Sequence, residues 1–352
     1  MSDSDAILFD TRGALGVITL NRPKALNALT RAMCLALHAQ LDAWAGDDGI
    51  DAVLIEGAGD KALCAGGDVV MLHDSGKAGS DDWRWFFHDE YRMNSAIHHF
   101  PKPYIALQDG ITMGGGVGVS VHGDFRVATE RVLFAMPETG LGLIPDVGGG
   151  YFLPRLPGQT GLYLALTGYR ARAADCLYLG VATHHVPSAA LADLTAALAG
   201  QRLADGAAVA ALIDRFGEDP GPPPLAEHRD AIDRHFAHDS VAAIMASLAD
   251  DGSEWARKTH ALLTTKSPIS MKVTFEQLRR GATLAFDENM VMEYRIVNRI
   301  LTHDHDFYEG VRAILLDKDN KPVWNPARLE DVAPSDVVAH FEPPVAGDLT
   351  FD

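Results

Sequence analysis

The sequence predicts an α/β protein with a helical carboxy-terminal region. Short apolar runs typical of buried strands alternate with helix-like periodicity through the first half of the chain. This alternation is typical of α/β architectures. Beyond about Ser188 the composition changes to Ala- and Leu-rich helical segments. Periodicity alone leaves two topologies open, an open doubly wound sheet and a spiral of ββα turns.

The elements of the first half follow in order from local patterns. Residues 15–20 form a short β-prone run that ends at the turn Asn21-Arg22-Pro23. Thr30 is expected to cap the next helix, whose apolar residues recur at steps of three and four: Met33, Leu37, Leu41 and Trp44. Further buried strands are predicted at residues 52–55, 104–107, 125–128 and 133–135.

The second half is predicted to be mainly helical. Residues 217–220 and the prolines 222–224 cannot continue a regular helix, so a loop is expected there. Helical patterning then runs from Leu225 to about Leu316 and includes 271–278 and 284–301. We therefore divide the chain into a core with the active site (1–187), a mainly helical region (188–333) and an extended tail (334–352).

Composition limits the classes of function. A chain of 352 residues that is 47% apolar can bury a sizeable core. The net charge of −18, without any basic run, makes nucleic acid an unexpected partner. An acidic surface still allows an anionic ligand such as coenzyme A, because a few local cations and backbone N–H groups can hold phosphates.

The cysteines and the amino terminus predict a cytoplasmic protein. Cys34, Cys64 and Cys176 lie far apart and form no C-x-x-C pair, which favours a reducing compartment. The first ten residues are acidic and lack the pattern of a signal or transit peptide. No apolar run reaches membrane-spanning length, so no membrane association is expected.

Four glycine-containing segments are candidates for chemistry: 64–68, 110–118, 137–140 and 145–150. Glycine lets a backbone N–H approach a ligand without an intervening Cβ. Two converging turns of this kind could build an oxyanion hole, although each alone also suits an ordinary tight turn. None matches the phosphate loop or the dinucleotide-binding fingerprint, so a bound nucleotide cofactor is not predicted.

Together these segments resemble a known family. The run Asn21-Arg22-Pro23-Lys24-Ala25-Leu26-Asn27-Ala28-Leu29, then 65–68, 110–116 and 137–138, is similar in order and spacing to the crotonase superfamily. Within it, segments 110–118, 134–138, 145–156 and 267–268 resemble the 3-hydroxyisobutyryl-CoA hydrolases. The resemblance covers most of the chain, and the combination of motifs is specific.

The resemblance implies a spiral of ββα turns and a coenzyme A thioester as substrate. It also implies that the N–H groups of Gly67 and Gly115 form the oxyanion hole. Arg22, Lys24 and Ala25 are then expected near the coenzyme A nucleotide, with a solvated turn as the alternative. No separate cofactor and no metal are expected, and a homo-oligomer stays open because oligomers are common on this fold.

The type of reaction depends on two positions. Hydratases of the superfamily use two glutamates; Glu138 matches one, but the second would fall at Gly118. The hydrolases pair the glutamate with an aspartate eight residues later, where Asp146 stands. Glu138 is then expected to attack the carbonyl and form a mixed anhydride, with direct activation of water as the alternative. Asp146 is expected to position the substrate hydroxyl or the water and to shift the pKa of Glu138.

Individually these residues have ordinary explanations. Glu138 alone is explained as an acid at a helix N-terminus, and Asp146 alone as a turn residue. Their combination with two glycine turns favours a catalytic role. Glu90 matches a substrate-contacting acid of the hydrolases, with a solvated helix acid as the alternative. The run 303–306, His-Asp-His-Asp, is interpreted as a polar loop rather than a metal site, because no third ligand is suggested.

The predicted activity is hydrolysis of a short branched 3-hydroxyacyl-CoA, as in valine breakdown. Two alternatives remain: an enoyl-CoA hydratase or isomerase, which Gly118 disfavours, and a non-catalytic acyl-CoA-binding relative, which intact Glu138 and Asp146 disfavour.

Overall fold

The computed structural model describes residues 5–351, which group into two compact units that interleave along the chain. Unit 1 contains the described residues up to Gly67 together with 92–135 and 170–226. Unit 2 contains 68–91, 136–169 and the described residues from Glu227 onward. Composition predicts consecutive regions instead, because it does not show which distant segments pack together.

Unit 1 contains two sheets. Its strands are β1 (Ile7–Arg12), β2 (Leu15–Leu20), β3 (Ala52–Gly57), β4 (Ala62–Cys64), β5 (Tyr104–Gln108), β6 (Ile111–Met113), β7 (Phe125–Ala128), β8 (Leu133–Ala135) and β9 (His184–His185). One sheet has the order β1-β2-β3-β5-β7-β9 and the other the order β4-β6-β8. All pairings are parallel except the antiparallel pair β1 and β2.

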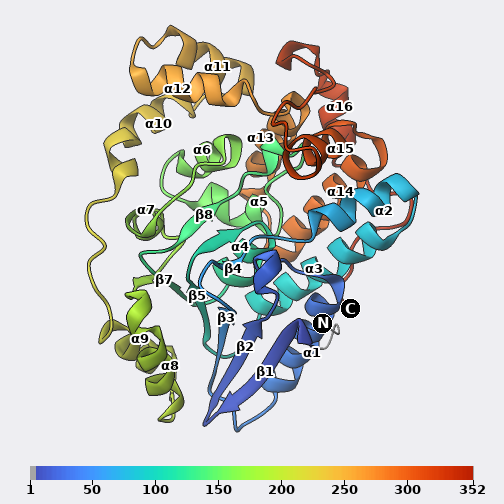
Figure 1. The fold of residues 1–352 in the computed structure, drawn as a ribbon. Coiled ribbons are helices and arrows are strands. Elements are labelled where there is room, and N and C mark those ends of the chain that lie inside the picture. Colours follow the sequence, from blue (N-terminus) through green and yellow to red (C-terminus); the bar gives the residue numbers. More distant parts are fainter. Residues whose placement is uncertain (1–4, 352) are drawn as a thin grey trace. The chain divides into compact units, whose positions relative to one another are not determined.

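The strand order confirms the spiral fold (Figure 1). Each of the consecutive pairs β3/β4, β5/β6 and β7/β8 adds one strand to the large sheet and one to the small sheet. A doubly wound sheet would place all of these strands in a single layer. The predicted strands at 15–20, 52–55, 104–107, 125–128 and 133–135 are all present. Strands β1, β4, β6 and β9 were not predicted. Strands β4, β6 and β9 have only two or three residues, which is too few for a periodic signal. Strand β1 has six residues but lies mostly at the surface, so it has no buried apolar run.

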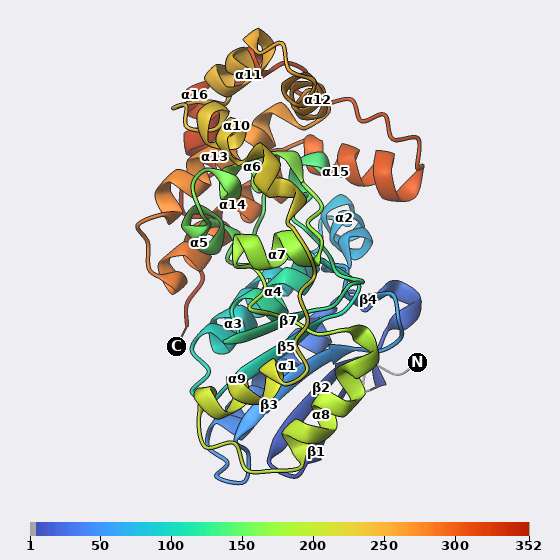
Figure 2. The same cartoon turned by 90° about the vertical axis from the view of Figure 1, so that its left-hand side faces the viewer.

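Helices of unit 1 cover the large sheet. They are α1 (Arg31–Ala45), α4 (Gly115–Val121), α7 (Ala173–Leu179), α8 (Leu191–Ala199) and α9 (Gly206–Asp214). Thr30 caps α1 as predicted, since its side chain accepts a hydrogen bond from the Met33 N–H. Apolar residues of β2, β3 and β5 pack with those of α8 and α9 in one core cluster, and Figure 2 shows these two helices beside the sheet. A parallel strand covered on both faces reads as a continuous apolar run, which is why these strands were predictable.

Unit 2 is helical. Its helices are α2 (Val69–Ala78), α5 (Gly149–Phe152), α6 (Thr160–Thr167), α10 (Arg229–His235), α11 (Val241–Asp250), α12 (Glu254–Leu263), α13 (Pro268–Gly281), α14 (Phe286–His303), α15 (Asp306–Val311) and α16 (Pro334–Ala339). Helix α3 (Asp82–His98) contributes residues to both units. Within residues 5–351, no helix is long and apolar enough to cross a membrane.

The interruptions of the helical region are where the prolines predict them, with one correction. No helix crosses residues 217–223, as expected from their Gly and Pro content. The tail 334–352, predicted to be extended, instead begins with helix α16. Pro334 stands at the first helical position, where the missing N–H removes no helical hydrogen bond.

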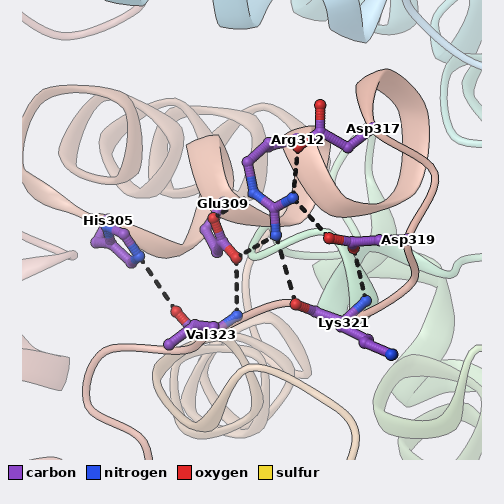
Figure 3. Close-up of polar contacts among 7 residues, drawn as sticks. All are labelled: His305, Glu309, Arg312, Asp317, Asp319, Lys321 and Val323. Atoms are coloured by element: carbon purple, nitrogen blue, oxygen red, sulfur yellow. Dashed lines mark hydrogen bonds and ion pairs between the residues drawn. The ribbon is translucent and has the colours of Figure 1, made fainter.

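A polar cluster ties the segment after α15 back to that helix (Figure 3). The Arg312 guanidinium donates to Glu309 at 2.7 and 2.9 Å, to Asp317 at 2.6 Å and to Asp319 at 2.8 Å. The N–H of Val323 also donates to Glu309, at 2.9 Å. Glu309, Asp317 and Asp319 therefore hold the segment 317–323 against the end of α15.

Candidate active site

Two glycine turns lie side by side in unit 1. They follow β4 and β6, which are parallel neighbours, so their carboxyl ends lie at the same edge of the small sheet. Gly66 has φ +120°, a conformation that residues with a side chain rarely adopt, and a Cβ there would lie 3.8 Å from the Gly115 nitrogen. A Cβ on Gly116 would lie 2.1 Å from the Cys64 carbonyl oxygen, so only glycine allows this close approach.

The N–H groups of Gly67 and Gly115 are available to a ligand. Gly115 is the first residue of α4, where an N–H has no partner within the helix. Gly67 forms a bridge with Leu29, but neither of the two glycine N–H groups donates to another backbone group within residues 5–351. An oxyanion hole needs N–H groups that are not already bonded, on turns that lie close together. The pairing of these turns agrees with the sequence, while the role of the N–H groups stays a prediction.

The segment Arg22 to Ala25 is tied to the first glycine turn. The residues that follow this segment bind that turn: Leu29 N–H donates to the Gly66 carbonyl at 2.8 Å, and Ala65 N–H donates to the Leu26 carbonyl at 3.0 Å. The guanidinium of Arg22 donates to the Ala28 carbonyl at 2.5 Å and so supports the backbone. Lys24 and Ala25 are exposed in the short 3-10 helix Pro23–Ala25. Lys24 is therefore the side chain of this segment best suited to meet an anion in solvent.

Unit 2 brings the three predicted acids together. Glu90 on α3, Glu138 on the 3-10 helix Glu138–Gly140, and Asp146 in the following turn are 2%, 5% and 5% exposed. The Tyr91 hydroxyl donates to Asp146 Oδ2 at 2.8 Å. Within the described chain, Glu138 Oε2 and Glu90 Oε1 are buried without a hydrogen-bond partner. Buried polar atoms are normally satisfied, so these two oxygens keep the capacity to accept a hydrogen bond from a substrate or water.

The burial of Glu90 excludes the alternative of a solvated helix acid. Glu90 shares a face of α3 with Phe86, Phe87 and Tyr91, all at most 2% exposed. A solvated helix acid would stand on the opposite face. Glu90 is thus an inward-facing member of the acid cluster.

Crowding of acids in a dry environment raises their pKa values. Burial, followed by the charge of Asp146, raises the pKa of Glu138 well above its usual range, and the Lys266 ammonium partly opposes this rise. The pKa of Glu90 is also raised, by burial and then by Asp146. Burial raises the pKa of Asp146 to about 6, against the hydrogen bond from Tyr91, which lowers it. Such perturbed, mutually interacting carboxyls are typical of catalytic sites.

The turn that carries Asp146 is strained. Val147 has φ +50° and Gly148 has φ +88°, and the Gly149 N–H donates to the Asp146 carbonyl at 2.8 Å. These features define a type I′ turn, in which both central residues favour glycine or asparagine. A β-branched valine in this conformation costs about 1 to 3 kcal/mol and persists only where its surroundings impose it.

Glu293 of α14 is a fourth buried acid that sequence reasoning missed. It is 0% exposed, and its carboxylate accepts hydrogen bonds from the N–H groups of Gly148 and Gly150 at 2.8 Å each. Burial raises the pKa of Glu293 to about 8. Its signal in the sequence is a single acid beside Met290, Met292 and Tyr294, a pattern that helix packing alone explains.

The acids of the run 303–306 pair with other segments of the chain. Asp304 pairs with His340 at 2.7 Å, and Asp306 accepts from the Ser267 hydroxyl at 2.6 Å and from the Asn325 N–H at 2.7 Å. Within the described residues, no group of His, Cys, Asp or Glu side chains has the arrangement of a metal site. These side chains join chain segments, in line with the interpretation as a polar loop.

Comparison with curated proteins finds relatives along nearly the whole chain. The "3-hydroxyisobutyryl-CoA hydrolase, mitochondrial" of Danio rerio is 50% identical over 332 residues, which are 93% of this chain and 87% of that protein. The protein of the same name from Homo sapiens is 44% identical and covers 99% of this chain and 91% of its own length.

Solved structures agree in fold. A carnitinyl-CoA dehydratase from Mycobacterium thermoresistibile is 43% identical with a TM-score of 0.93, covering 99% of both chains. An enoyl-CoA hydratase from Rhodobacter sphaeroides 2.4.1 is 39% identical with a TM-score of 0.90, covering 98% of this chain and 100% of that one. The model of the enoyl-CoA hydratase/isomerase family matches residues 15–341. This chain therefore belongs to the enoyl-CoA hydratase/isomerase family, which is the crotonase superfamily indicated by its glycine turns and Glu138.

Proposed function

We propose that this protein is an acyl-CoA thioester hydrolase that cleaves 3-hydroxyisobutyryl-CoA to 3-hydroxyisobutyrate and coenzyme A, a step of valine breakdown. The observation that carries the proposal is the buried pair of Glu138 and Asp146, with an unpartnered oxygen on Glu138. Hydrolases of this name are 44% and 50% identical to the chain, which supports the choice of substrate.

In the proposed mechanism, ionised Glu138 attacks the thioester carbonyl. The carbonyl electrons move to oxygen, where the N–H groups of Gly67 and Gly115 stabilise the negative charge. Collapse of this intermediate expels the coenzyme A thiolate and leaves a mixed anhydride between the acyl group and Glu138. Water then cleaves the anhydride, releases the hydroxy acid and restores the carboxylate.

Direct activation of water by Glu138 is the alternative route to the same products. Hydroxylamine separates the two routes, because it intercepts an anhydride and yields a hydroxamate while the carboxylate is regenerated. Hydroxylamine also cleaves a free thioester, so the enzyme-free reaction is subtracted. Hydroxamate that forms without faster thiol release supports the anhydride, whereas no enzyme-dependent hydroxamate supports direct attack by water.

The proposed preference for a 3-hydroxyacyl ester rests on Asp146. A carboxylate accepts a hydrogen bond from a 3-hydroxyl group, and Asp146 with a pKa of about 6 is largely ionised at neutral pH. An ester without the hydroxyl would give this buried charge one hydrogen-bond donor fewer, beside the hydroxyl of Tyr91 that already donates to it. We expect such esters to react more slowly.

Hydration of an enoyl-CoA is the second candidate, since the two similar solved structures carry the names of a dehydratase and a hydratase. Adding water across a double bond needs a coordinated acid and base. The second glutamate of the hydratases would fall at position 118, and this chain has a buried Gly118 in α4. Glycine can neither donate nor accept the proton.

The deciding experiment compares three substrates. We would measure thiol release from 3-hydroxyisobutyryl-CoA and isobutyryl-CoA, and water addition to crotonyl-CoA, for the wild type and Asp146→Ala. The wild type should release thiol from the hydroxy ester fastest, and Asp146→Ala should lose the preference for that ester. Faster hydration of crotonyl-CoA than thiol release would make the hydrolase assignment wrong.

We also propose the cytoplasm as the compartment, because Cys34, Cys64 and Cys176 are reduced and buried as expected in a reducing environment. The relatives named above carry "mitochondrial" in their names. Fractionation of the source cells, followed by an activity assay of each fraction, decides between the two compartments.

A further inference from the structure

We infer that Glu293 is a positioning residue that holds the strained turn 145–150 so that Asp146 meets the substrate hydroxyl. The inference rests on the proposed function for its effect on rate. Glu293 lies far from Asp146 in the sequence and does not itself need to touch the substrate.

The carboxyl group of Glu293 is surrounded by N–H donors. Its Oε2 accepts from the Gly148 N–H at 2.8 Å, and its Oε1 accepts from the Gly150 N–H at 2.8 Å. The same Oε1 also accepts from the side-chain amides of Asn289 at 2.9 Å and Gln277 at 3.1 Å. A carboxylate can accept all four bonds, whereas a neutral amide in its place turns one acceptor into a donor.

The bonds act on the turn from two sides. Glu293 holds the two glycine N–H groups that follow Asp146, and Gln277 of α13 donates to the Pro145 carbonyl, just before it, at 2.8 Å. Successive N–H groups in a turn with positive φ form a concave anion-binding "nest". The carboxyl group of Glu293 fills this one with its two oxygens.

Strain in the turn explains why such a clamp is needed. Val147 adopts φ +50° although it is β-branched, and its side chain is 1% exposed. Released from its hydrogen bonds, the turn is expected to relax toward negative φ, and Asp146 would move with it. A displacement of about 1 Å at a reacting group is enough to cost on the order of a hundredfold in rate.

The test variant is Glu293→Gln, with Glu288→Gln as the matched control. Glu288 is an exposed residue of the same helix and caps its first turn, a task that glutamine also performs. With 3-hydroxyisobutyryl-CoA, Glu293→Gln should lower kcat by about ten- to a hundredfold while KM changes by less than about threefold. The control should behave as the wild type.

A double-mutant cycle separates positioning from general loss of structure. If Glu293 acts through Asp146, then Asp146→Ala combined with Glu293→Gln should be no more than about twofold slower than Asp146→Ala alone. A double variant that loses the full factor of both single changes overturns the inference. An unchanged kcat in Glu293→Gln overturns it as well.

Hydrogen exchange tests the clamp independently of activity. The Gly148 and Gly150 amides should exchange faster in Glu293→Gln than in the wild type, while amides of α1 in unit 1 keep their protection. Equal exchange of both glycine amides would contradict the clamp. If the wild type releases no thiol from the hydroxy ester, the proposed function fails, and this exchange result still decides whether Glu293 holds the turn.

Discussion

Glu138 and Asp146 are buried to the same extent, yet their surroundings shift their pKa values differently. Asp146 accepts a hydrogen bond from Tyr91, which limits the rise of its pKa to about 6. Glu138 has an unpartnered oxygen, and the charge of Asp146 raises its pKa further. Separated pKa values of this kind are how neighbouring carboxyls take different roles.

Replacing Glu138 by glutamine should abolish turnover and spare binding. The Glu138→Gln side chain keeps its size but cannot attack a carbonyl, so kcat for thiol release should fall by on the order of a thousandfold or more. The dissociation constant for a non-hydrolysable coenzyme A ester, measured by calorimetry, should change by less than about threefold. Near-normal turnover would remove Glu138 from the mechanism.

Lys266 should set the pH range of the reaction. Its positive charge lowers the pKa of Glu138, against burial and Asp146, and only the ionised glutamate can attack. Lys266→Met should therefore shift the ascending limb of the kcat/KM profile to higher pH and leave the plateau unchanged. Lys272→Met is the control, because the Lys272 ammonium donates to the Val332 carbonyl and does not contribute to the pKa of Glu138. A limb that stays in place would show that Lys266 does not act on the essential carboxyl.

At the scale of elements, the short strands β4 and β6 end at the glycine turns whose backbone N–H groups we propose as the oxyanion hole. Glycine is required there by close approach, as the 2.1 Å clash of a Cβ on Gly116 illustrates. We therefore expect the reaction rate to fall when one of these N–H groups is removed and to change little with many side-chain substitutions elsewhere.

Removing the Gly67 N–H should slow the reaction. Gly67→Pro deletes the donor, and the loss of one oxyanion-hole hydrogen bond lowers the rate by on the order of a hundred- to a thousandfold. Gly67→Ala keeps the N–H and serves as the matched variant. Thiol release should be much slower in the proline variant than in the alanine variant, with circular dichroism confirming that both are folded. Equal rates would exclude Gly67 from the oxyanion hole.

At the scale of the whole molecule, the buried acids make stability depend on pH. Glu293 has a pKa of about 8 in the folded protein against 4.5 for a free side chain, so the folded state binds more protons between these values. The stability linked to that proton is fully present below about pH 4.5 and is lost as the pH rises through about 8. Acids in ion pairs, such as Glu309, whose pKa the hydrogen bonds from Arg312 lower to about 2, change their contribution only at lower pH.

The free energy of unfolding should therefore fall between about pH 5 and about pH 8. Urea unfolding followed by circular dichroism at a series of pH values measures this slope. In Glu293→Gln the slope should be shallower above about pH 6, whatever the absolute stability of the variant. A slope that is the same in both proteins would show that Glu293 does not titrate in this range.

Local sequence was enough to predict the elements and turns that depend on neighbouring residues. The Thr30 cap, the apolar runs of β2, β3 and β5, and the proline break near 222 act over a few positions. The acids Glu138, Asp146 and Glu90 were found through their motifs, although the motif left open whether Glu90 faces solvent. Only burial on the inner face of α3 decided that point.

The partners of those acids depended on tertiary structure. Tyr91 reaches Asp146 across 55 positions, and Glu293 reaches Gly148 across 145. The pairing of β4, β6 and β8 was equally hidden, because it joins segments far apart in the sequence, and β4 and β6 are too short for a periodic signal. A motif records which groups the chemistry needs, whereas the pKa and position of each group come from burial and from charges far away in sequence, which exist only once the chain has folded.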